Sequence, residues 1–447
     1  MRYGNSGRME RRLLVGVIGL GYIGSVIATE IALRNNLVFA YESSELKRKR
    51  ISEELIDINE PGLTDALISQ IRRGQVILCE DISELDNAEV ILICVGTPLN
   101  KGTADLTALD KLAVQLQKIL TESKLVIIKS TVPPGTTEEF SIKLNASEFK
   151  HKVVFSPERL AEGQAFEDLR SIPIIVGGIN PESTNEAENF WRDIGFDVIT
   201  VSDAKTAELI KLADNCWIDL NIAFAHELAQ ICDSIGVDVL EVIKSANTLK
   251  KGSSYVNILT PSVGVGGYCL TKDPIFLHKY AESKGIQLKL SAAGRIVNDN
   301  SPKYLVNKLI GEVQNLESKK ILILGIAFKN NSGDIRHSPA IQFMQEMKNS
   351  KIAYSWYDSL VNAIDLTQEL VNTRIEKLNF NQWDVIINLA AHKDDIFYDL
   401  NTLTQLFLDN GVFVDGRRFL SKSEIDNLAK TGIKYIGVGR SIREVTN

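Results

Sequence analysis

Cysteine is scarce in this sequence, with five residues among 447, at positions 79, 94, 216, 232 and 269. They are too few and too scattered for a disulfide framework, and none forms the Cys-x-x-Cys spacing of a metal site. The five histidines, at 151, 226, 278, 337 and 392, also lack metal-ligand spacing, so we expect no bound metal. We expect a cytoplasmic protein, because free thiols persist in a reducing compartment.

Net positive charge and long apolar runs are absent as well. The 50 Lys and Arg residues are outnumbered by 57 Asp and Glu residues, which gives a net charge of −7 and argues against nucleic acid as a partner. No stretch approaches the roughly 20 apolar residues of a membrane span, so no membrane partner is expected. The hydrophobic content of 44% still allows a sizeable core, and the length suggests two or three domains.

The N-terminal segment imitates the charged start and apolar stretch of a signal peptide. Four glycines, at positions 16, 19, 21 and 24, interrupt that stretch, and no small-x-small cleavage site ends it. A buried strand followed by a helix is the preferred interpretation, and secretion is the alternative.

Strand and helix patterns divide the chain into three parts. In the first part, apolar strand-like runs alternate with helical spacers, which predicts a parallel sheet covered on both faces. Residues 204–235 carry apolar side chains at helical spacing with little Gly or Pro, which predicts one long helix. The alternation returns from Lys319. We therefore predict an α/β fold in which two doubly wound parallel-sheet domains, 1–203 and 301–447, are joined by a central helical domain, 204–300.

The sequence GLGYIG at 19–24 fits the Gly-x-Gly-x-x-Gly pattern of dinucleotide-binding loops, directly after a predicted strand and before a helix. Such glycines permit a tight turn, close approach of a pyrophosphate and helix packing, while the helix N-terminus offers free N–H groups. Glu42 ends the next predicted strand, where a carboxylate can bind ribose hydroxyls and repel a 2′-phosphate, so NAD is favoured over NADP. A purely structural glycine turn is the alternative.

Cys269 is the cysteine least like a core residue. The other four lie in apolar strand-like or helical stretches, whereas Cys269 follows the glycines of PSVGVGGYC and precedes Lys272 and Asp273. Glycines permit close approach of a substrate, and a nearby cation or loop N–H groups favour the thiolate, which is the nucleophilic form. An inert loop cysteine fits the same pattern, so both interpretations stay open.

Several polar residues occupy positions suited to a ligand. Lys211 and Asn215 are one helical turn apart and share a face, although a solvated face explains such a pair equally well. Thr131 lies at a predicted strand end, where α/β folds expose side chains to the ligand crevice, but turn formation alone explains the adjacent Pro-Pro-Gly. Glu158 and Glu162 in SPERLAEG are either catalytic carboxylates or solvated loop charges.

Basic residues gather after a later predicted strand, ILILGIA, whose sequence weakly echoes the first glycine loop. Phe328, Lys329 and Arg336 follow this strand, and an arginine can bind a phosphate in a bidentate way. A salt bridge between Arg336 and Asp334 is the alternative.

Seven motifs occur together and in order: GLGYIG (19–24), VGTP (95–98), STVPPGT (130–136), SPERLAEG (156–163), ELIKLADN (208–215), GVGGYCLTKDP (264–274) and GIAFKNNSGDIRHSPA (325–340). Together they resemble the nucleotide-sugar 6-dehydrogenases, the superfamily of UDP-glucose, UDP-N-acetylhexosamine and GDP-mannose dehydrogenases, over residues 13–440. The resemblance implies two Rossmann-like domains, NAD as cofactor and a nucleotide-sugar substrate. It also implies a homodimer or higher homo-oligomer formed through the central helix.

The resemblance further implies a four-electron oxidation of the sugar C6 alcohol to a carboxylate, through a thiohemiacetal and a thioester on Cys269. Asp273 or Lys211 would take the hydroxyl proton, and Lys211 with Asn215 would stabilise the oxyanion. The implied catalytic residues are Cys269, Lys211, Asn215, Asp273, Glu158 and Thr131. The implied cofactor-binding residues are Gly19, Gly21, Tyr22, Ile23, Gly24, Glu42, Gly96, Thr97, Thr131 and Lys272. The implied substrate-binding residues are Arg159, Leu160, Glu162, Lys211, Gly266, Gly267, Phe328, Lys329 and Arg336.

Two departures from the family pattern bear on the substrate. Arg159 follows the Ser-Pro-Glu motif where UDP-glucose enzymes usually have an aromatic residue, and this form resembles the N-acetylhexosamine branch. Val265 replaces a common phenylalanine, which leaves room for a 2-acetamido group. We therefore expect a UDP-N-acetyl-hexosamine (ManNAc or GlcNAc) 6-dehydrogenase for surface polysaccharide synthesis, with UDP-glucose as the alternative substrate. A two-electron hydroxyacid-type dehydrogenase and a sensor without turnover are the rival functions.

Overall fold

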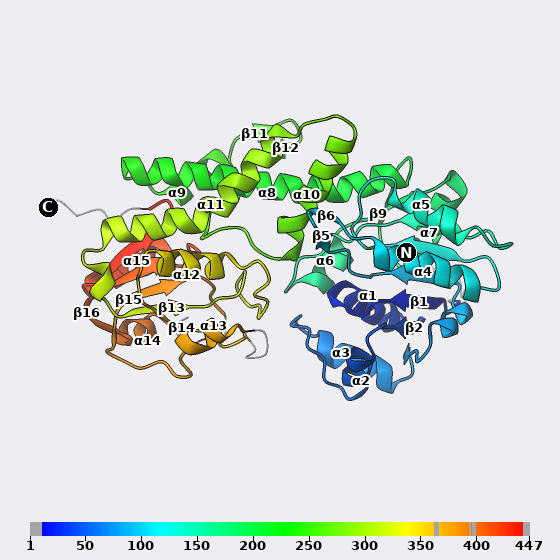
Figure 1. The fold of residues 1–447 in the computed structure, drawn as a ribbon, viewed down its shortest axis with the longest axis horizontal. Helices are drawn as coiled ribbons and strands as arrows, with labels where there is room; N and C mark the ends of the chain where they lie inside the picture. Colours follow the sequence, from blue (N-terminus) through cyan, green and yellow to red (C-terminus); the bar gives the residue numbers. More distant parts are fainter. Residues whose placement is uncertain (1–10, 362–365, 393–394, 396–398, 441–447) are drawn as a thin grey trace, which may run out of the picture. The chain divides into compact units, whose positions relative to one another are not determined.

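The computed structural model describes residues 11–361, 366–392, 395 and 399–440. The chain divides into two compact units, Met1–Ala213 and Asp214–Asn447. Helix α8 (Ala204–Ile235) begins in the first unit and ends in the second, and it confirms the long helix predicted from apolar spacing (Figure 1). Within the described ranges, no helix is long and apolar enough to cross a bilayer, and no cluster of three His, Cys, Asp or Glu could hold a metal ion. The division into three domains stays a prediction.

An eight-stranded sheet forms the centre of the first unit, in the order β10-β9-β8-β7-β4-β1-β2-β3. Its strands are β1 (Leu14–Ile18), β2 (Leu37–Tyr41), β3 (Val76–Leu78), β4 (Val90–Ile93), β7 (Leu125–Ile128), β8 (Lys152–Phe155), β9 (Ile174–Gly178) and β10 (Val198–Thr200). In this order, the neighbouring strands β8, β7, β4, β1, β2 and β3 all run parallel to one another. The strand order reverses between β1 and β4, and such a switch point is where open α/β sheets bind ligands.

One pair departs from the predicted parallel arrangement, because β9 runs antiparallel to β8. The segment 156–173 that joins them contains one short helix, α6 (Ala165–Ser171), and it starts and finishes at the carboxyl end of β8. Since the chain does not cross back behind the sheet, the next strand must run in the opposite direction. The loop that carries Glu158 therefore stays at the carboxyl edge of the sheet.

Helices cover both faces of the first sheet. They are α1 (Tyr22–Leu33), α2 (Glu45–Ser52), α3 (Leu63–Arg72), α4 (Thr107–Ile119), α5 (Thr136–Leu144), α6 and α7 (Pro181–Ile194), with a 3-10 helix at Ile82–Asn87 and a small hairpin of β5 (Leu99–Asn100) and β6 (Thr103–Ala104). Along β7, Leu125 and Ile127 enter one buried cluster, and Val126 and Ile128 enter the other. Because side chains alternate and both faces are buried, the strand is apolar throughout.

The second unit combines helices with a smaller sheet of five parallel strands, in the order β14-β13-β15-β16-β17 (Figure 1). Its helical part holds α9 (Val239–Ala246), α10 (Tyr268–Ser283), α11 (Lys289–Glu312), the hairpin of β11 (Lys250–Lys251) and β12 (Ser254–Tyr255), and a 3-10 turn at Leu316–Ser318. The strands are β13 (Ile321–Leu324), β14 (Ser355–Tyr357), β15 (Trp383–Asn388), β16 (Phe407–Asp415) and β17 (Lys434–Gly437). The helices around them are α12 (Pro339–Asn349), α13 (Gln368–Thr373), α14 (Leu400–Gln405) and α15 (Lys422–Lys430).

The two units repeat one local structure, as the weak sequence echo indicates. After β1, the Gly19 N–H donates to the Tyr41 carbonyl at 2.8 Å; after β13, the Gly325 N–H donates to the Tyr357 carbonyl at 2.8 Å. In both loops the next N–H donates to a carboxylate at the end of the neighbouring strand, Glu42 at 3.1 Å and Asp358 at 2.7 Å. Each sheet therefore presents a glycine turn of the same kind at its carboxyl edge.

Candidate active site

The GLGYIG loop joins β1 to α1, and its three glycines serve different purposes. Gly19 has φ +91°, and a Cβ there would lie 2.8 Å from the Cys94 carbonyl oxygen. A Cβ on Gly24 would lie 1.8 Å from the Gly19 carbonyl oxygen, so only glycine fits. A Cβ on Gly21, the N-cap of α1, would meet no atom of the described residues within 4 Å. Gly19 and Gly24 thus allow the loop to pack tightly against the chain, while the space in front of Gly21 is left unfilled by the described residues. A pyrophosphate that binds at a helix N-terminus requires such space.

Glu42 follows β2 and is a buried carboxylate bound to the glycine loop. Its Oε2 accepts the Leu20 N–H at 3.1 Å, and its Oε1 accepts the Ser44 N–H at 3.1 Å. Burial raises the pKa of Glu42, but these N–H groups and the nearby Lys47 ammonium together hold the pKa below its usual range. An ionised carboxylate here fits the ribose hydroxyls of NAD and repels a 2′-phosphate.

We expect Glu42→Gln to raise the KM for NAD about tenfold, since about 1.4 kcal/mol of binding energy corresponds to that factor. The same variant should raise the ratio of kcat/KM for NADP to that for NAD, because the repulsive charge is gone while an amide oxygen can still accept the Leu20 N–H. Initial rates with both cofactors at a fixed concentration of the second substrate measure this ratio. Glu45→Gln, a change at an exposed residue in the first turn of α2, is the matched control. An unchanged ratio in Glu42→Gln would contradict the assigned role.

Predicted cofactor residues meet at the carboxyl ends of β4 and β7. Thr97 Oγ1 donates to the carbonyl oxygen of Thr131 at 2.7 Å, and both residues are buried. A Cβ on Gly96 would have open space in front of it, with no atom of the described chain within 4 Å. Tyr22 and Ile23 open helix α1 after the glycine loop. The structure therefore brings these residues of the first unit to one edge of its sheet.

Glu158 and Lys211 form a buried ion pair in the first unit. Lys211 Nζ lies 2.9 Å from Glu158 Oε1, and the side chains are only 6% and 9% exposed. Burial raises the pKa of Glu158, but the Lys211 ammonium, the Leu160 N–H and the Lys129 charge together hold the pKa below its usual range. Glu158 Oε2 accepts the Leu160 N–H at 3.0 Å. Glu158 is thus not a solvated loop charge, whereas Glu162 is half-exposed on the same segment.

Sequence analysis did not identify two polar residues beside this pair and the glycine loop. Lys129 is buried at the end of β7, and burial lowers its pKa to about 8. Glu60 accepts the N–H groups of Gly163 at 2.6 Å and Ala165 at 2.8 Å, and it also binds the Tyr22 hydroxyl. Glu60 therefore ties the glycine loop to the segment that carries Glu158. Its sequence context, Asn-Glu-Pro-Gly, resembles an ordinary turn and gives no separate signal.

In the second unit, Cys269 is exposed and lies in the first turn of α10, whose N-cap is Gly267. The free N–H groups and partial positive charge of a helix N-terminus favour a thiolate. The other four cysteines differ, because burial raises the pKa of their thiols, to about 12 in Cys79, Cys94 and Cys216, and also upward in Cys232. The thiol most suited to act as a nucleophile is that of Cys269.

The glycines before Cys269 accommodate side chains of the same unit. Gly267 has φ +85°, and a Cβ there would lie 2.7 Å from the ring of Phe328. A Cβ on Gly266 would lie 2.5 Å from Pro339 Cδ. The sequence predicted that these glycines allow close approach of a substrate. In the structure, the space where their Cβ atoms would lie is occupied by Phe328 and Pro339. The loop carrying Cys269 is therefore packed firmly against the segment that follows β13.

Asp273 is fully buried one turn after Cys269 and holds two predicted site residues. Its Oδ1 accepts a hydrogen bond from Lys272 Nζ at 2.6 Å, and its Oδ2 accepts one from Asn215 Nδ2. Lys272 Nζ also lies 4.4 Å from the centre of the Phe276 ring. Helix α8 thus supplies Lys211 to Glu158 in the first unit and Asn215 to Asp273 in the second.

Arg336 forms the salt bridge with Asp334 that was the alternative interpretation, with Nη2 and Oδ2 2.6 Å apart. Its side chain nevertheless stays 60% exposed. The guanidinium also lies 5.2 Å from the centre of the Tyr268 ring, directly before Cys269. Lys329 Nζ lies 5.5 Å from the centre of the Phe328 ring. Arg336 can therefore engage a phosphate while Asp334 orients it.

The doubly wound sheet, the open glycine loop and the ionised Glu42 define an NAD-dependent dehydrogenase. Family comparison is more specific: the NAD-binding domain of the UDP-glucose/GDP-mannose dehydrogenase family matches residues 13–195, its central domain 205–300, and its UDP-binding domain 322–422. The chain belongs to the UDP-glucose/GDP-mannose dehydrogenase family. It is an NAD-dependent nucleotide-sugar dehydrogenase, which confirms the family, fold class and cofactor predicted from the motifs.

Relatives with related names cover nearly the whole chain. A UDP-N-acetyl-D-mannosamine dehydrogenase of Pyrococcus horikoshii is 30% identical over 435 residues, which are 95% of this chain and 99% of the relative. A solved structure of the UDP-D-ManNAc dehydrogenase from Pyrococcus horikoshii has a TM-score of 0.81 at 28% identity, covering 96% of this chain and 99% of that one. A UDP-glucose dehydrogenase from Pyrobaculum islandicum has a TM-score of 0.84 at 27% identity, covering 98% and 100%.

Proposed function

We propose that the protein oxidises the C6 alcohol of a UDP-N-acetyl-hexosamine, ManNAc or GlcNAc, to the uronate in a four-electron reaction. The observation that carries this proposal is the exposed Cys269 at the N-terminus of α10, next to the buried group formed by Asp273, Lys272 and Asn215. A two-electron dehydrogenase would need no such nucleophile. NAD, when bound at the glycine loop, accepts a hydride in each of the two oxidations.

The proposed roles follow the chemistry of each group. Asp273, or Lys211 acting through water if its amine is neutral at that step, takes the hydroxyl proton as the hydride leaves C6, so that a carbonyl forms. The Cys269 thiolate then bonds to C6, and the oxygen takes up a proton to give a thiohemiacetal. Loss of a second hydride and of that proton gives a thioester. Water adds to the thioester, the thiolate leaves, and a carboxylate is released.

Charge stabilisation and water activation are assigned to the remaining catalytic residues. Lys211 and Asn215 would stabilise the oxyanion that develops on the C6 oxygen, because both are donors held by a buried carboxylate. Glu158 and Thr131, with Asp273, would position or activate the water. The proposed catalytic set is therefore supported by two buried pairs, one in each unit.

For the substrate, we propose that Lys329 and Arg336 bind the diphosphate and that the N-acetyl branch is preferred. The exposed guanidinium of Arg336 and the family's UDP-binding domain at 322–422 support the first point. The name of the Pyrococcus horikoshii relative supports the second. Arg159 donates to the Pro173 carbonyl of its own unit, so its effect on the substrate would be exerted through the shape of the loop. UDP-glucose is the second candidate, since a dehydrogenase named for it has the same fold.

We propose a homodimer, or a higher homo-oligomer, formed through the central helix. Trp217, Phe224 and Ile231 on α8 are 58%, 49% and 56% exposed, and their seven-residue spacing places them on one face. A row of large exposed apolar side chains is the signature of a surface that another chain covers. We assign the product to surface polysaccharide synthesis, because uronates are building blocks of such polymers.

The deciding experiment measures NADH formation with UDP-ManNAc, UDP-GlcNAc, UDP-GalNAc, UDP-glucose and GDP-mannose. We expect two NADH per sugar and a uronate product, with the highest kcat/KM for UDP-ManNAc or UDP-GlcNAc. A strong preference for UDP-glucose would overturn the proposed substrate. One NADH per sugar would overturn the four-electron reaction, and turnover of none of them would support a sensor.

A further inference from the structure

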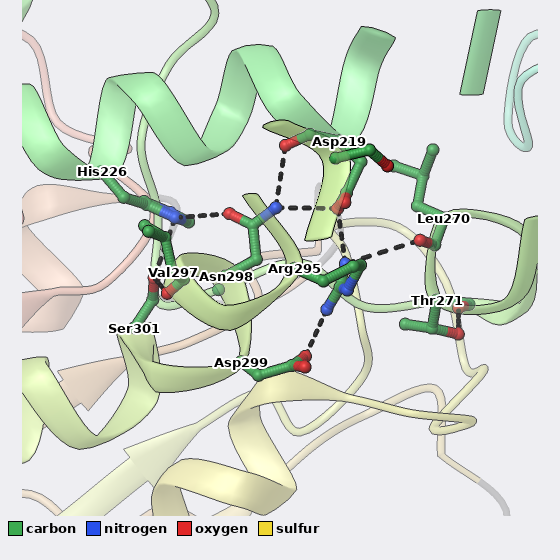
Figure 2. A network of polar contacts seen from close by, with 12 residues as sticks. Asp219, His226, Leu270, Thr271, Arg295, Val297, Asn298, Asp299 and Ser301 are labelled. Carbon is green, nitrogen blue, oxygen red and sulfur yellow. Dashed lines mark hydrogen bonds and ion pairs between the residues drawn. The ribbon is translucent and has the colours of Figure 1, made fainter. Parts of the chain in front are cut away.

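A buried polar network joins α8 to α11 in the second unit (Figure 2). It consists of Asp219, His226, Arg295, Asn298 and Ser301, and we call it the Asp219–His226 network. Asn298 Nδ2 donates to the Asp219 carbonyl oxygen at 2.8 Å and to Asp219 Oδ1 at 2.7 Å. Arg295 forms an ion pair with the same carboxylate. Asp219 and Asn298 are each 1% exposed and His226 is 3% exposed, so their hydrogen bonds are made inside the protein, and among the described residues only Asp219 Oδ2 of this group has no hydrogen-bond partner.

The hydrogen bonds of this network fix the tautomer of His226. The Ser262 N–H lies 3.1 Å from His226 Nε2, and a backbone N–H can only donate, so Nε2 must be the unprotonated acceptor. Nδ1 therefore carries the proton and donates it toward Asn298 Oδ1, which lies 2.9 Å away. The Ser301 Oγ atom lies 2.8 Å from the same nitrogen and is a second acceptor for this proton. The Asn298 amide cannot flip, because its nitrogen is already bound to Asp219.

His226 also stays neutral at physiological pH. Burial lowers its pKa to about 4, and the positive charges of Arg417 and Arg295 act in the same direction, against the opposing effect of the Asn298 oxygen. A protonated ring would place Nε2–H against the Ser262 N–H, a donor facing a donor. The ring is thus held in the one form that can accept the Ser262 N–H.

The network contacts the backbone on both sides of the loop that carries Cys269. On one side, His226 holds Ser262, whose Oγ donates to the Gly264 carbonyl at 2.9 Å. On the other side, Arg295 Nη1 donates to the carbonyl of Leu270, the residue after Cys269, at 3.4 Å (Figure 2). Glycine backbones have little conformational preference of their own, so such a loop needs external anchors to hold one geometry.

We infer that the Asp219–His226 network positions the Cys269 thiol, with His226 as the positioning residue that fixes the start of the glycine loop. The inference rests on the proposed role of Cys269. The contacts of the network are with Ser262 and Leu270, on either side of Cys269. A displacement of about 1 Å at a reacting group costs on the order of 10²-fold in rate, so an anchor behind the loop can control turnover without contacting the substrate.

The first test compares His226→Ala with His226→Gln. Alanine removes the acceptor for the Ser262 N–H, so we expect kcat to fall about 10- to 100-fold while the KM for NAD changes less than about twofold. Glutamine offers an oxygen near the position of Nε2, so we expect it to recover most of the loss. The rate at which iodoacetamide alkylates Cys269 at pH 7 should fall at least about threefold in His226→Ala and recover in His226→Gln. Peptide mass spectrometry assigns the labelled thiol.

The matched control is Tyr304→Phe, which removes the 2.6 Å hydrogen bond between Tyr304 and Asp233. This bond joins the same two helices, but it does not anchor the Cys269 loop. We expect lower thermal stability with unchanged kcat and alkylation rate. An equal loss in Tyr304→Phe, or wild-type alkylation and kcat in folded His226→Ala, would overturn the inference.

A second variant keeps the test decisive if His226→Ala does not fold. Ser262→Ala removes only the hydroxyl that binds Gly264, at a half-buried position, and should still lower the alkylation rate. An unchanged rate in that case would count against the inference. The alkylation measurements need no turnover. They therefore test the anchor even if no nucleotide sugar is oxidised, an outcome that would count against the proposed function instead.

Discussion

We expect Cys269→Ser to lower the rate of NADH formation by on the order of 10³-fold or more, because a serine hydroxyl is not ionised at neutral pH and adds poorly to an aldehyde. The thiol lies at the N-terminus of α10, where the helix stabilises a thiolate but cannot supply the far larger stabilisation that an alkoxide needs. The variant should keep its affinity for NAD, since the glycine loop belongs to the first unit.

Single-turnover NADH formation and mass spectrometry of the quenched enzyme check this expectation. In the wild type with limiting NAD, an adduct with the mass of the oxidised nucleotide sugar should appear on the peptide that contains Cys269. The matched control is Cys232→Ala, a change at a buried cysteine of the same unit, which should lower stability and leave kcat nearly unchanged. A Cys269→Ser enzyme with wild-type turnover would eliminate the covalent route.

Local sequence patterns were sufficient to predict the long helix α8 and the strand, glycine loop and helix that form the cofactor site. A strand, three glycines, a helix and an acidic strand end lie within residues 13–42, so one short segment contains nearly all the information. The echo between residues 17–21 and 323–327 also proved meaningful, since both loops bind a carboxylate at the next strand end. Spacing likewise identified α8, because apolar periodicity over 32 residues is a strong signal.

Long-range partners were beyond the reach of the same patterns. Nothing local links Glu60 to Gly163, or Lys211 to Glu158, because the members of each pair lie far apart in the sequence and meet only in the folded chain. The reversed strand β9 was missed for a related reason: an apolar run predicts a strand but not its direction. In the sequence, His226 lies on an apolar helix and has no neighbour at the spacing of metal ligands. Only its hydrogen bonds to Ser262 and Asn298 in the structure indicate a positioning role.

The second large effect is expected for Lys211→Met. Loss of a donor to the developing oxyanion should lower kcat about 10²- to 10³-fold. The same change leaves Glu158 buried without its main partner, and breaking a buried pair costs about 3–5 kcal/mol of the free energy of unfolding. Steady-state kinetics and chemical denaturation at pH 7 measure the two losses. Lys308→Met removes a different buried Lys–carboxylate pair, with Asp233, and should lose stability while kcat stays within about twofold.

Acidification separates the structural role of Lys211 from its catalytic role. In the wild type the pKa of Glu158 is held low, so its contribution to stability is present above the unfolded value of about 4.3 and is lost as the pH falls below it. Without Lys211, burial favours the protonated acid, so the stability deficit should be smaller at pH 5 than at pH 7. Lys211→Met/Glu158→Gln should abolish that pH dependence and recover stability, but not kcat. Recovery of kcat in the double variant would show that neither Lys211 nor Glu158 is needed for catalysis.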